Sequence, residues 1–154
     1  MRASVTAFVA LGANLGDPAT SLLQALDDIA AIPGVVLVKR SSLYRSAPLA
    51  ASGPDYVNAV AELQTVLSAP ALLAALQQIE QLAGRERPSR NAPRTLDLDL
   101  LTYGDASMVS ETLVIPHPRL TERAFVLLPL AEIAPQRVTA AQLQAVQGQA
   151  IERL

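Results

Sequence analysis

Two carboxylates, Asp97 and Asp99, stand two positions apart in the alternating run RTLDLDL at 94–100. Side chains alternate across a β-strand, so both acids face one side, with their Cα atoms about 7 Å apart at about 3.3 Å rise per residue. At this spacing, both carboxylates can converge on one or two hard cations. A half-exposed strand with a solvated acidic face is the alternative, and a bare Asp-x-Asp pattern by itself favours that alternative.

Arginine supplies eleven of the twelve basic residues, and Lys39 is the other. One short segment holds four of them: Arg85, Arg87, Arg90 and Arg94. The guanidinium group is a planar fork of donors that matches phosphate or carboxylate. The segment therefore fits a polyanion bound together with a metal. It fits simple neutralisation of the two aspartates equally well.

Glu80 lies in the last turn of an expected helix, where a negative charge opposes the helix dipole at a cost of about 0.3–1 kcal/mol. An ion pair with Arg85 or Arg87 offsets this cost, and we prefer it to a ligand contact. His117 is the only histidine and lies between two prolines that restrict the backbone. Rigidity suits a positioned donor, and Arg123 follows closely enough to reach the same anion, although a lone loop histidine is more often a surface residue.

Tyr56 and Asn58 share one face of another expected strand. Asparagine is a poor strand former, but its amide offers both a donor and an acceptor to the edge of a heterocycle. The alternative places Tyr56 at a strand edge and bonds Asn58 to nearby backbone. The residues alone slightly favour that alternative.

Composition excludes several classes of protein. The chain has 154 residues, 51% of them hydrophobic, which predicts one domain over 1–154. It has no cysteine, which rules out disulfides and thiolate chemistry. A net charge of −2 argues against bulk attraction to nucleic acid. We see no P-loop, secretory signal or membrane-spanning stretch, and we expect a cytoplasmic protein.

The elements that position these residues follow from apolar periodicity and turn signals. Strands are expected at Val5–Leu11, Val35–Tyr44, Tyr56–Leu67, Thr95–Tyr103 and Leu113–Ile115. Helices are expected from Asp17 and Pro18, from Ser68 to Gly84, over Phe125–Glu132, and peripherally within Thr139–Leu154. This order predicts an α+β fold with a ferredoxin-like split βαβ core, a mainly antiparallel sheet covered by helices.

Six motifs together resemble 6-hydroxymethyl-7,8-dihydropterin pyrophosphokinase, an enzyme family of folate biosynthesis. They are LGANLGD at 11–17, YRSAPL at 44–49, PDYVNA at 54–59, GRER at 84–87, PRTLDLDL at 93–100 and PHPR at 116–119. The resemblance runs in order from about residue 5 to 135. It implies transfer of the β,γ-diphosphate of ATP to the hydroxymethyl group of the reduced pterin, with release of AMP.

The resemblance also implies residue roles. Asp97 and Asp99 would hold two Mg²⁺ ions that bridge the triphosphate, and Arg85 and Arg94 would act with them in catalysis. The remaining ATP contacts would come from Glu80, Arg87, Leu98, His117 and Arg123. The pterin would meet Tyr56 and Phe125 on its two faces, the Asn58 amide at its edge, and backbone groups around Ser46, Ala47 and Leu49. The implied partners are ATP and the pterin, without nucleic acid or membrane, and the implied state is a monomer.

The chain departs from the family pattern in the arginine segment and upstream of the PHPR motif. Asn91-Ala92 stands where many relatives carry Trp-Gly, and Thr112 and Val114 replace positions where some carry Arg and Thr. Two other hypotheses stand beside this one, and these changes motivate the first of them. One is a catalytically weak ferredoxin-like module that binds ATP or pterin, and the other is a metal-dependent phosphohydrolase that breaks down ATP without pterin.

Overall fold

The computed structural model describes residues 3–14, 16–47, 54–84 and 96–154. In these residues the elements, in order, are β1 (Val5–Ala13), α1 (Pro18–Ala30), β2 (Val35–Arg40), β3 (Tyr44–Ser46), β4 (Tyr56–Thr65), α2 (Ala69–Gly84), β5 (Asp97–Tyr103), β6 (Met108–Val109), β7 (Val114–Ile115), α3 (Ala124–Ile133), a 3₁₀ turn (Pro135–Arg137), α4 (Ala140–Ala145) and β8 (Ile151–Arg153).

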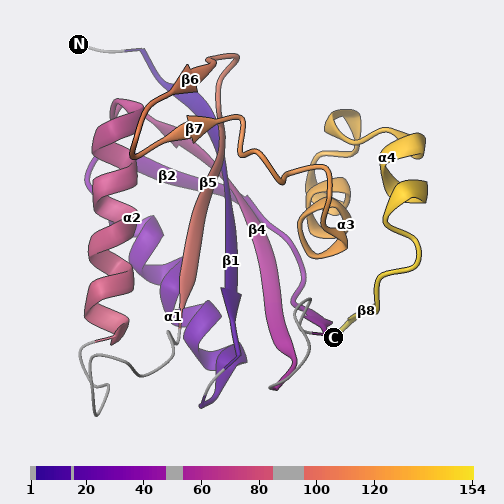
Figure 1. The fold of residues 1–154 in the computed structure, drawn as a ribbon. Coiled ribbons are helices and arrows are strands. Elements are labelled where there is room, and N and C mark those ends of the chain that lie inside the picture. Colours follow the sequence, from indigo (N-terminus) through magenta and orange to yellow (C-terminus); the bar gives the residue numbers. More distant parts are fainter. Residues whose placement is uncertain (1–2, 15, 48–53, 85–95) are drawn as a thin grey trace.

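One antiparallel sheet organises the described chain, with strand order β5-β1-β4-β3-β8. β2 also pairs with β4, along the half of β4 that β3 leaves free. β6 and β7 form a separate small hairpin. α1 and α2 cover one face of the sheet, and α3 and α4 lie on the other side (Figure 1). The predicted ferredoxin-like α+β fold is confirmed.

The first helix begins where the sequence predicts. Asp17 is its N-cap and accepts a hydrogen bond from the Thr20 amide at 3.3 Å, and Pro18 follows at the first helical position. Leu22, Leu26 and Ile29 repeat at helical spacing and are all buried. This apolar stripe packs α1 against the sheet.

Two apolar clusters hold the layers together. The larger joins the sheet to α1 and α2, and the smaller joins the opposite face of the sheet to α3. β1 and β4 are buried on both faces, which explains their near-continuous apolar sequences. Among the described residues no helix is long and apolar enough to cross a membrane.

The strand predicted over Val35–Tyr44 is interrupted. β2 ends at Arg40 and β3 begins at Tyr44. Between them, the Ser42 amide donates to both carboxylate oxygens of Glu132, at 3.0 and 3.1 Å. The amide in the connecting segment is thus bonded to a side chain 90 positions away. Local strand propensity cannot reveal such a partner.

The C-terminal tail also differs from its prediction. A helix is present, α4, but it spans only six residues, and the chain then forms strand β8, which pairs with β3. The Thr139 side chain accepts from the Gln142 amide at 3.0 Å in a capping box, which is the local signal that favoured a helix. The tail therefore returns to the main sheet.

Candidate functional site

Three strands place the predicted site residues in one row across the sheet. Gly12 in β1 is the partner of Asp97 in β5 on one side and of Asn58 in β4 on the other. Directly opposed residues of an antiparallel pair share a face. At about 4.8 Å between strands, the Asp97 and Asn58 backbones lie about 10 Å apart. The carboxylate and the amide thus flank a glycine.

Asp99 lies in the next row on the same face, opposite Ala10. The prediction that the two acids share one face is confirmed. Asp99 is exposed and Asp97 is partly exposed, whereas Leu98 and Leu100 between and beyond them are buried on the other face. In the described part of the chain no group of three His, Cys, Asp or Glu side chains could hold a metal ion.

Asn58 is buried, with 3% of its surface exposed. Its Oδ1 accepts a hydrogen bond from the Ser46 hydroxyl at 2.6 Å. This bond fixes the amide, because the oxygen is turned toward Ser46 and the nitrogen is left as the donor. The Asn58 side chain therefore bonds to another side chain, across β3 and β4, and not to nearby backbone as in the alternative.

Gly12 leaves space beside that amide. A Cβ at this position would lie 3.2 Å from the Asn58 Nδ2, its nearest neighbour and a tight approach. A glycine inside a strand often marks such a close approach. The strand predicted from the sequence ends at Leu11, which places Gly12 in the following turn, whereas β1 continues to Ala13 and brings Gly12 into the sheet beside the amide.

Tyr56 and α3 border the same face. Tyr56 pairs with Ser46 in register and shares the face of Asn58. Phe125, at the second position of α3, packs partly buried against the smaller apolar cluster, and the Arg123 guanidinium carbon lies 5.3 Å from its ring centroid. Stacking of a ring between Tyr56 and Phe125 stays a prediction.

His117 lies beside β5. Its amide donates to the Leu101 carbonyl at 2.9 Å, and its Nδ1 accepts from the Arg119 amide at 3.2 Å. With Nδ1 as an acceptor, the neutral ring carries its proton on Nε2. The loop histidine is thus held as a donor near the strand that bears the two aspartates.

Glu80 connects α2 to β5. Its Oε2 accepts from the Leu98 amide at 2.7 Å, so the carboxylate meets the backbone just after Asp97. An ion pair of Glu80 with Arg85 or Arg87 is untested, because both arginines lie outside the described residues. Arg90, Arg94 and Leu49 also lie outside them, whereas Ser46 and Ala47 are described, at the end of β3.

The carboxylate of Glu132 supports β3. Glu132 in α3 accepts hydrogen bonds from the Tyr44 hydroxyl at 2.8 Å and from the Ser42 hydroxyl at 2.9 Å, and Arg153 lies 3.4 Å away. Desolvation opposes its charge, but these bonds outweigh it and lower the pKa of Glu132. Burial, reinforced by Glu132, raises the pKa of Tyr44 to about 12.

Glu132→Gln is expected to lower the free energy of unfolding near pH 7 by about 1–2 kcal/mol, since a charge-assisted acceptor becomes a neutral one. A lowered pKa contributes stability above the ordinary value near 4.3, and this is lost as pH falls through the folded value. The deficit should therefore shrink below about pH 4. Urea unfolding from pH 3 to 9 measures it, with exposed Glu111→Gln as control. A deficit that does not change with pH would contradict this origin.

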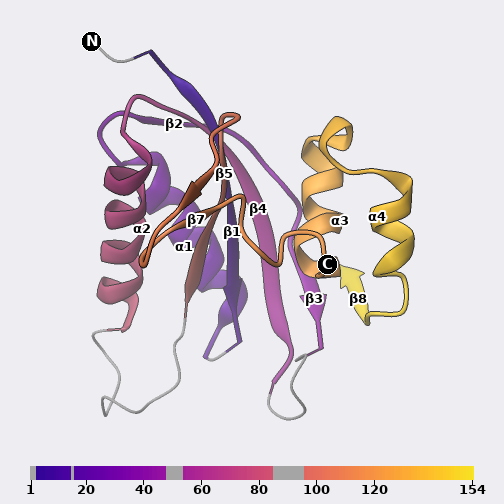
Figure 2. The same ribbon diagram turned by 45° about the horizontal axis from the view of Figure 1, so that its top comes forward.

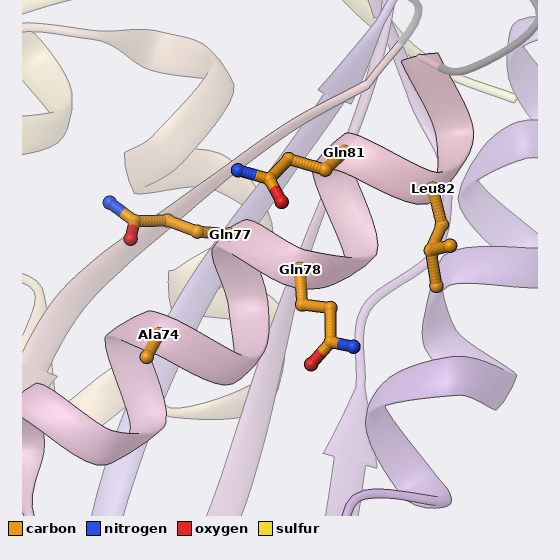
Figure 3. Close-up of a pocket in the computed structure, with 5 residues that line it drawn as sticks. All are labelled: Ala74, Gln77, Gln78, Gln81 and Leu82. Carbon is orange, nitrogen blue, oxygen red and sulfur yellow. The ribbon is translucent and has the colours of Figure 1, made fainter.

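A pocket lies along α2, lined by Ala74, Gln77, Gln78, Gln81 and Leu82. Gln78 and Leu82 point toward one side of the helix, and Gln77 and Gln81 toward another (Figure 3). All these residues lie on α2, whereas the predicted aspartates and asparagine lie on β5 and β4. None of these glutamines is among the residues predicted for the site.

Fold and site together define a ferredoxin-like α+β protein with an acidic pair and a fixed amide on one face of its sheet. The sequence profile of the 7,8-dihydro-6-hydroxymethylpterin-pyrophosphokinase family matches residues 8–135. This chain belongs to that family. The family predicted from the six motifs is thereby confirmed.

Curated relatives agree. A 2-amino-4-hydroxy-6-hydroxymethyldihydropteridine pyrophosphokinase of Haemophilus influenzae is 47% identical over 135 residues, covering 87% of this chain and 84% of the relative. The enzyme of the same name from Synechocystis is 46% identical over 132 residues, covering 86% of this chain and 68% of the relative.

Solved structures show the same fold at low identity. A wild-type HPPK-DHPS of Plasmodium falciparum, crystallised with pterin and p-hydroxybenzoate, superposes with a TM-score of 0.72 at 14% identity and covers 94% of this chain. Another HPPK-DHPS structure, in complex with substrates, gives a TM-score of 0.68 at 12% identity. This chain spans 43% and 42% of those longer chains.

Proposed function

We propose that this chain transfers the β,γ-diphosphate of ATP to the hydroxymethyl group of 6-hydroxymethyl-7,8-dihydropterin, releasing AMP, with Mg²⁺ at Asp97 and Asp99. The row Asp97–Gly12–Asn58 carries the proposal. It sets a group suited to a heterocycle about 10 Å from a group suited to a metal–phosphate complex. Family membership supplies the reaction.

The Asn58 amide would hold the polar edge of the pterin. The Ser46 bond leaves its Nδ2 as the donor, so a carbonyl oxygen of the ring is the matching acceptor. The absent side chain at Gly12 lets the ring substituent approach the backbone between the amide and the acids. A hydroxymethyl group at this place would face the carboxylate side.

The donor set at β5 fits magnesium. Mg²⁺ is commonly bound by one or two carboxylates completed by phosphate oxygens and water, and two exposed or half-exposed aspartates supply this minimum. Asp97 and Asp99 would hold two ions, which would neutralise phosphate charge and lower the pKa of the substrate hydroxyl.

The surrounding polar groups would orient the nucleotide. The Nε2–H of His117 and the guanidinium of Arg123 are donors suited to phosphate oxygens, near the strand of the aspartates and at the start of α3. Glu80 fixes the Leu98 backbone next to Asp97. Arg85, Arg87 and Arg94 are proposed from the family motif alone, as donors that balance charge developing on the departing AMP.

AMP formation from ATP and Mg²⁺ is expected only when 6-hydroxymethyl-7,8-dihydropterin is present. The reason is positional, since the hydroxyl group of the pterin is the acceptor that the site aligns. Chromatography of nucleotides and pterins after timed incubation measures both products in a 1:1 ratio. EDTA should stop the reaction, and excess Mg²⁺ should restore it.

Other results would replace the proposal. AMP or ADP formed equally without pterin would identify a phosphohydrolase. Pterin binding without AMP, in a folded protein, would identify a binding module, with the Asn91-Ala92 departure as the first candidate cause. We further propose one domain, a monomer and a cytoplasmic location, of which sedimentation equilibrium tests the monomer.

A further inference from the structure

The C-terminal segment 146–154 lies beyond the part of the chain that matches the family profile, which ends at residue 135. It nevertheless contacts two walls of the candidate site. β8 approaches β3, and the turn before it approaches the start of α3 (Figure 2). These two elements carry Ser46 and Phe125, which lie far apart in the sequence.

Gln149 holds the start of α3. Its Oε1 accepts from the Ala124 amide at 2.9 Å, and its Nε2 donates to the Glu122 carbonyl at 2.8 Å. The first amides of a helix lack intrahelical partners. The N-cap residue Arg123 makes no side-chain capping bond, so Gln149 supplies a cap from 25 positions away. Phe125 directly follows Ala124, whose amide Gln149 holds.

The residues after Gln149 hold the other wall. Ile151 and Arg153 pair with Ser46 and Tyr44 in β3. The Ala47 amide donates to the Ala150 carbonyl at 3.3 Å. The Ser46 hydroxyl in turn fixes the Asn58 amide, so β8 is connected to that amide through β3.

Val146 anchors the segment. It is buried, with 3% exposure, in a third apolar cluster that it forms with Ala124 and Leu127 of α3. A buried anchor, a two-bond side-chain clamp and a strand pairing therefore follow one another within eight residues. Each of them contacts an element that borders the site.

We propose that segment 146–154 sets the geometry of the pterin site, and that Gln149 is a positioning residue that holds Phe125 at its place in the site wall. The inference rests on the proposed pterin substrate. Gln149 itself contacts α3 backbone and acts through it. Removing its amide would free the first turn of α3 and widen the distribution of Phe125 positions, which lowers pterin affinity.

Gln149→Met tests the inference, because methionine keeps the length of the side chain and removes both hydrogen bonds. We expect the Kd for 6-hydroxymethylpterin, measured by fluorescence titration at least 20 °C below the Tm of the variant, to rise about 5- to 10-fold. Gln149→Glu keeps the acceptor for the Ala124 amide and a charge that suits a helix start, but it loses the donor to the Glu122 carbonyl, so we expect a smaller rise in Kd than for Gln149→Met. Gln147→Ala removes an exposed glutamine of the same segment and should change nothing.

A merely structural role gives a different result. Gln149→Met would then lower the Tm but leave the Kd unchanged well below it, and that outcome overturns the inference. If the methionine variant does not fold, Gln149→Glu and Gln149→Ala replace it, and equal affinities in both would overturn the inference as well. Wild-type protein that binds no pterin overturns the proposed function, whereas wild-type binding with an unchanged variant Kd overturns the positioning role alone.

Discussion

Asp97→Ala and Asp99→Ala are each expected to reduce pterin-dependent AMP formation by at least about 10²-fold, with the fold retained. Loss of one group that stabilises developing charge typically costs 10²- to 10³-fold in rate. Both carboxylates lie on the face of β5 opposite the larger apolar cluster, so their removal leaves no cavity there. Asp99 is exposed, and substitutions at exposed positions usually change stability by about 0.5 kcal/mol or less.

The measurement is the initial rate of AMP release over a range of Mg²⁺ concentrations, together with far-UV circular dichroism. Asp97→Asn and Asp99→Asn keep the side-chain volume and should be nearly as inactive, which separates charge from shape. Asp105→Ala, in the exposed turn after β5, is the matched control and should be fully active. Undiminished activity in both alanine variants would refute the proposed metal site.

Much of the fold follows from local pattern. The Asp17-Pro18 start, the buried stripe of α1 and the alternation in β5 are each set by residues a few positions apart, and the structure has them as expected. For the same reason the shared face of Asp97 and Asp99 and that of Tyr56 and Asn58 follow from strand periodicity alone.

The misses have a common physical cause, because each depends on a partner distant in the sequence. Glu132 takes the Ser42 amide and ends β2 early, and β8 forms because β3 offers it an edge more than 100 positions away. Capping and propensity, which act locally, favoured one long strand and a terminal helix. The place of Gly12 between Asp97 and Asn58 could not be predicted, because it depends on the register of three strands.

Asn58→Ala is expected to lower kcat/KM for the pterin about 10²-fold, mainly through KM, with the KM for ATP nearly unchanged. A site built to hydrogen-bond a substrate loses affinity for it when a polar contact is deleted. The buried Ser46 hydroxyl would also lose its acceptor, at a cost of about 1–3 kcal/mol in stability. Kinetics should therefore be measured well below the Tm of the variant.

Gln64→Ala is the matched control, since this amide lies on the same strand and face and donates to Thr6 rather than toward the site. Its pterin KM should equal that of wild type. A pterin KM unchanged in Asn58→Ala would exclude the amide from substrate binding.

Ser46→Ala separates the presence of the Asn58 amide from its orientation. It keeps the asparagine but removes the hydroxyl that turns the amide nitrogen toward the space over Gly12. An amide free to flip offers the wrong group to the pterin for part of the time, so we expect a smaller loss than in Asn58→Ala, about 5- to 10-fold in kcat/KM. Equal losses in Ser46→Ala and Asn58→Ala would mean that the amide binds only when its orientation is fixed.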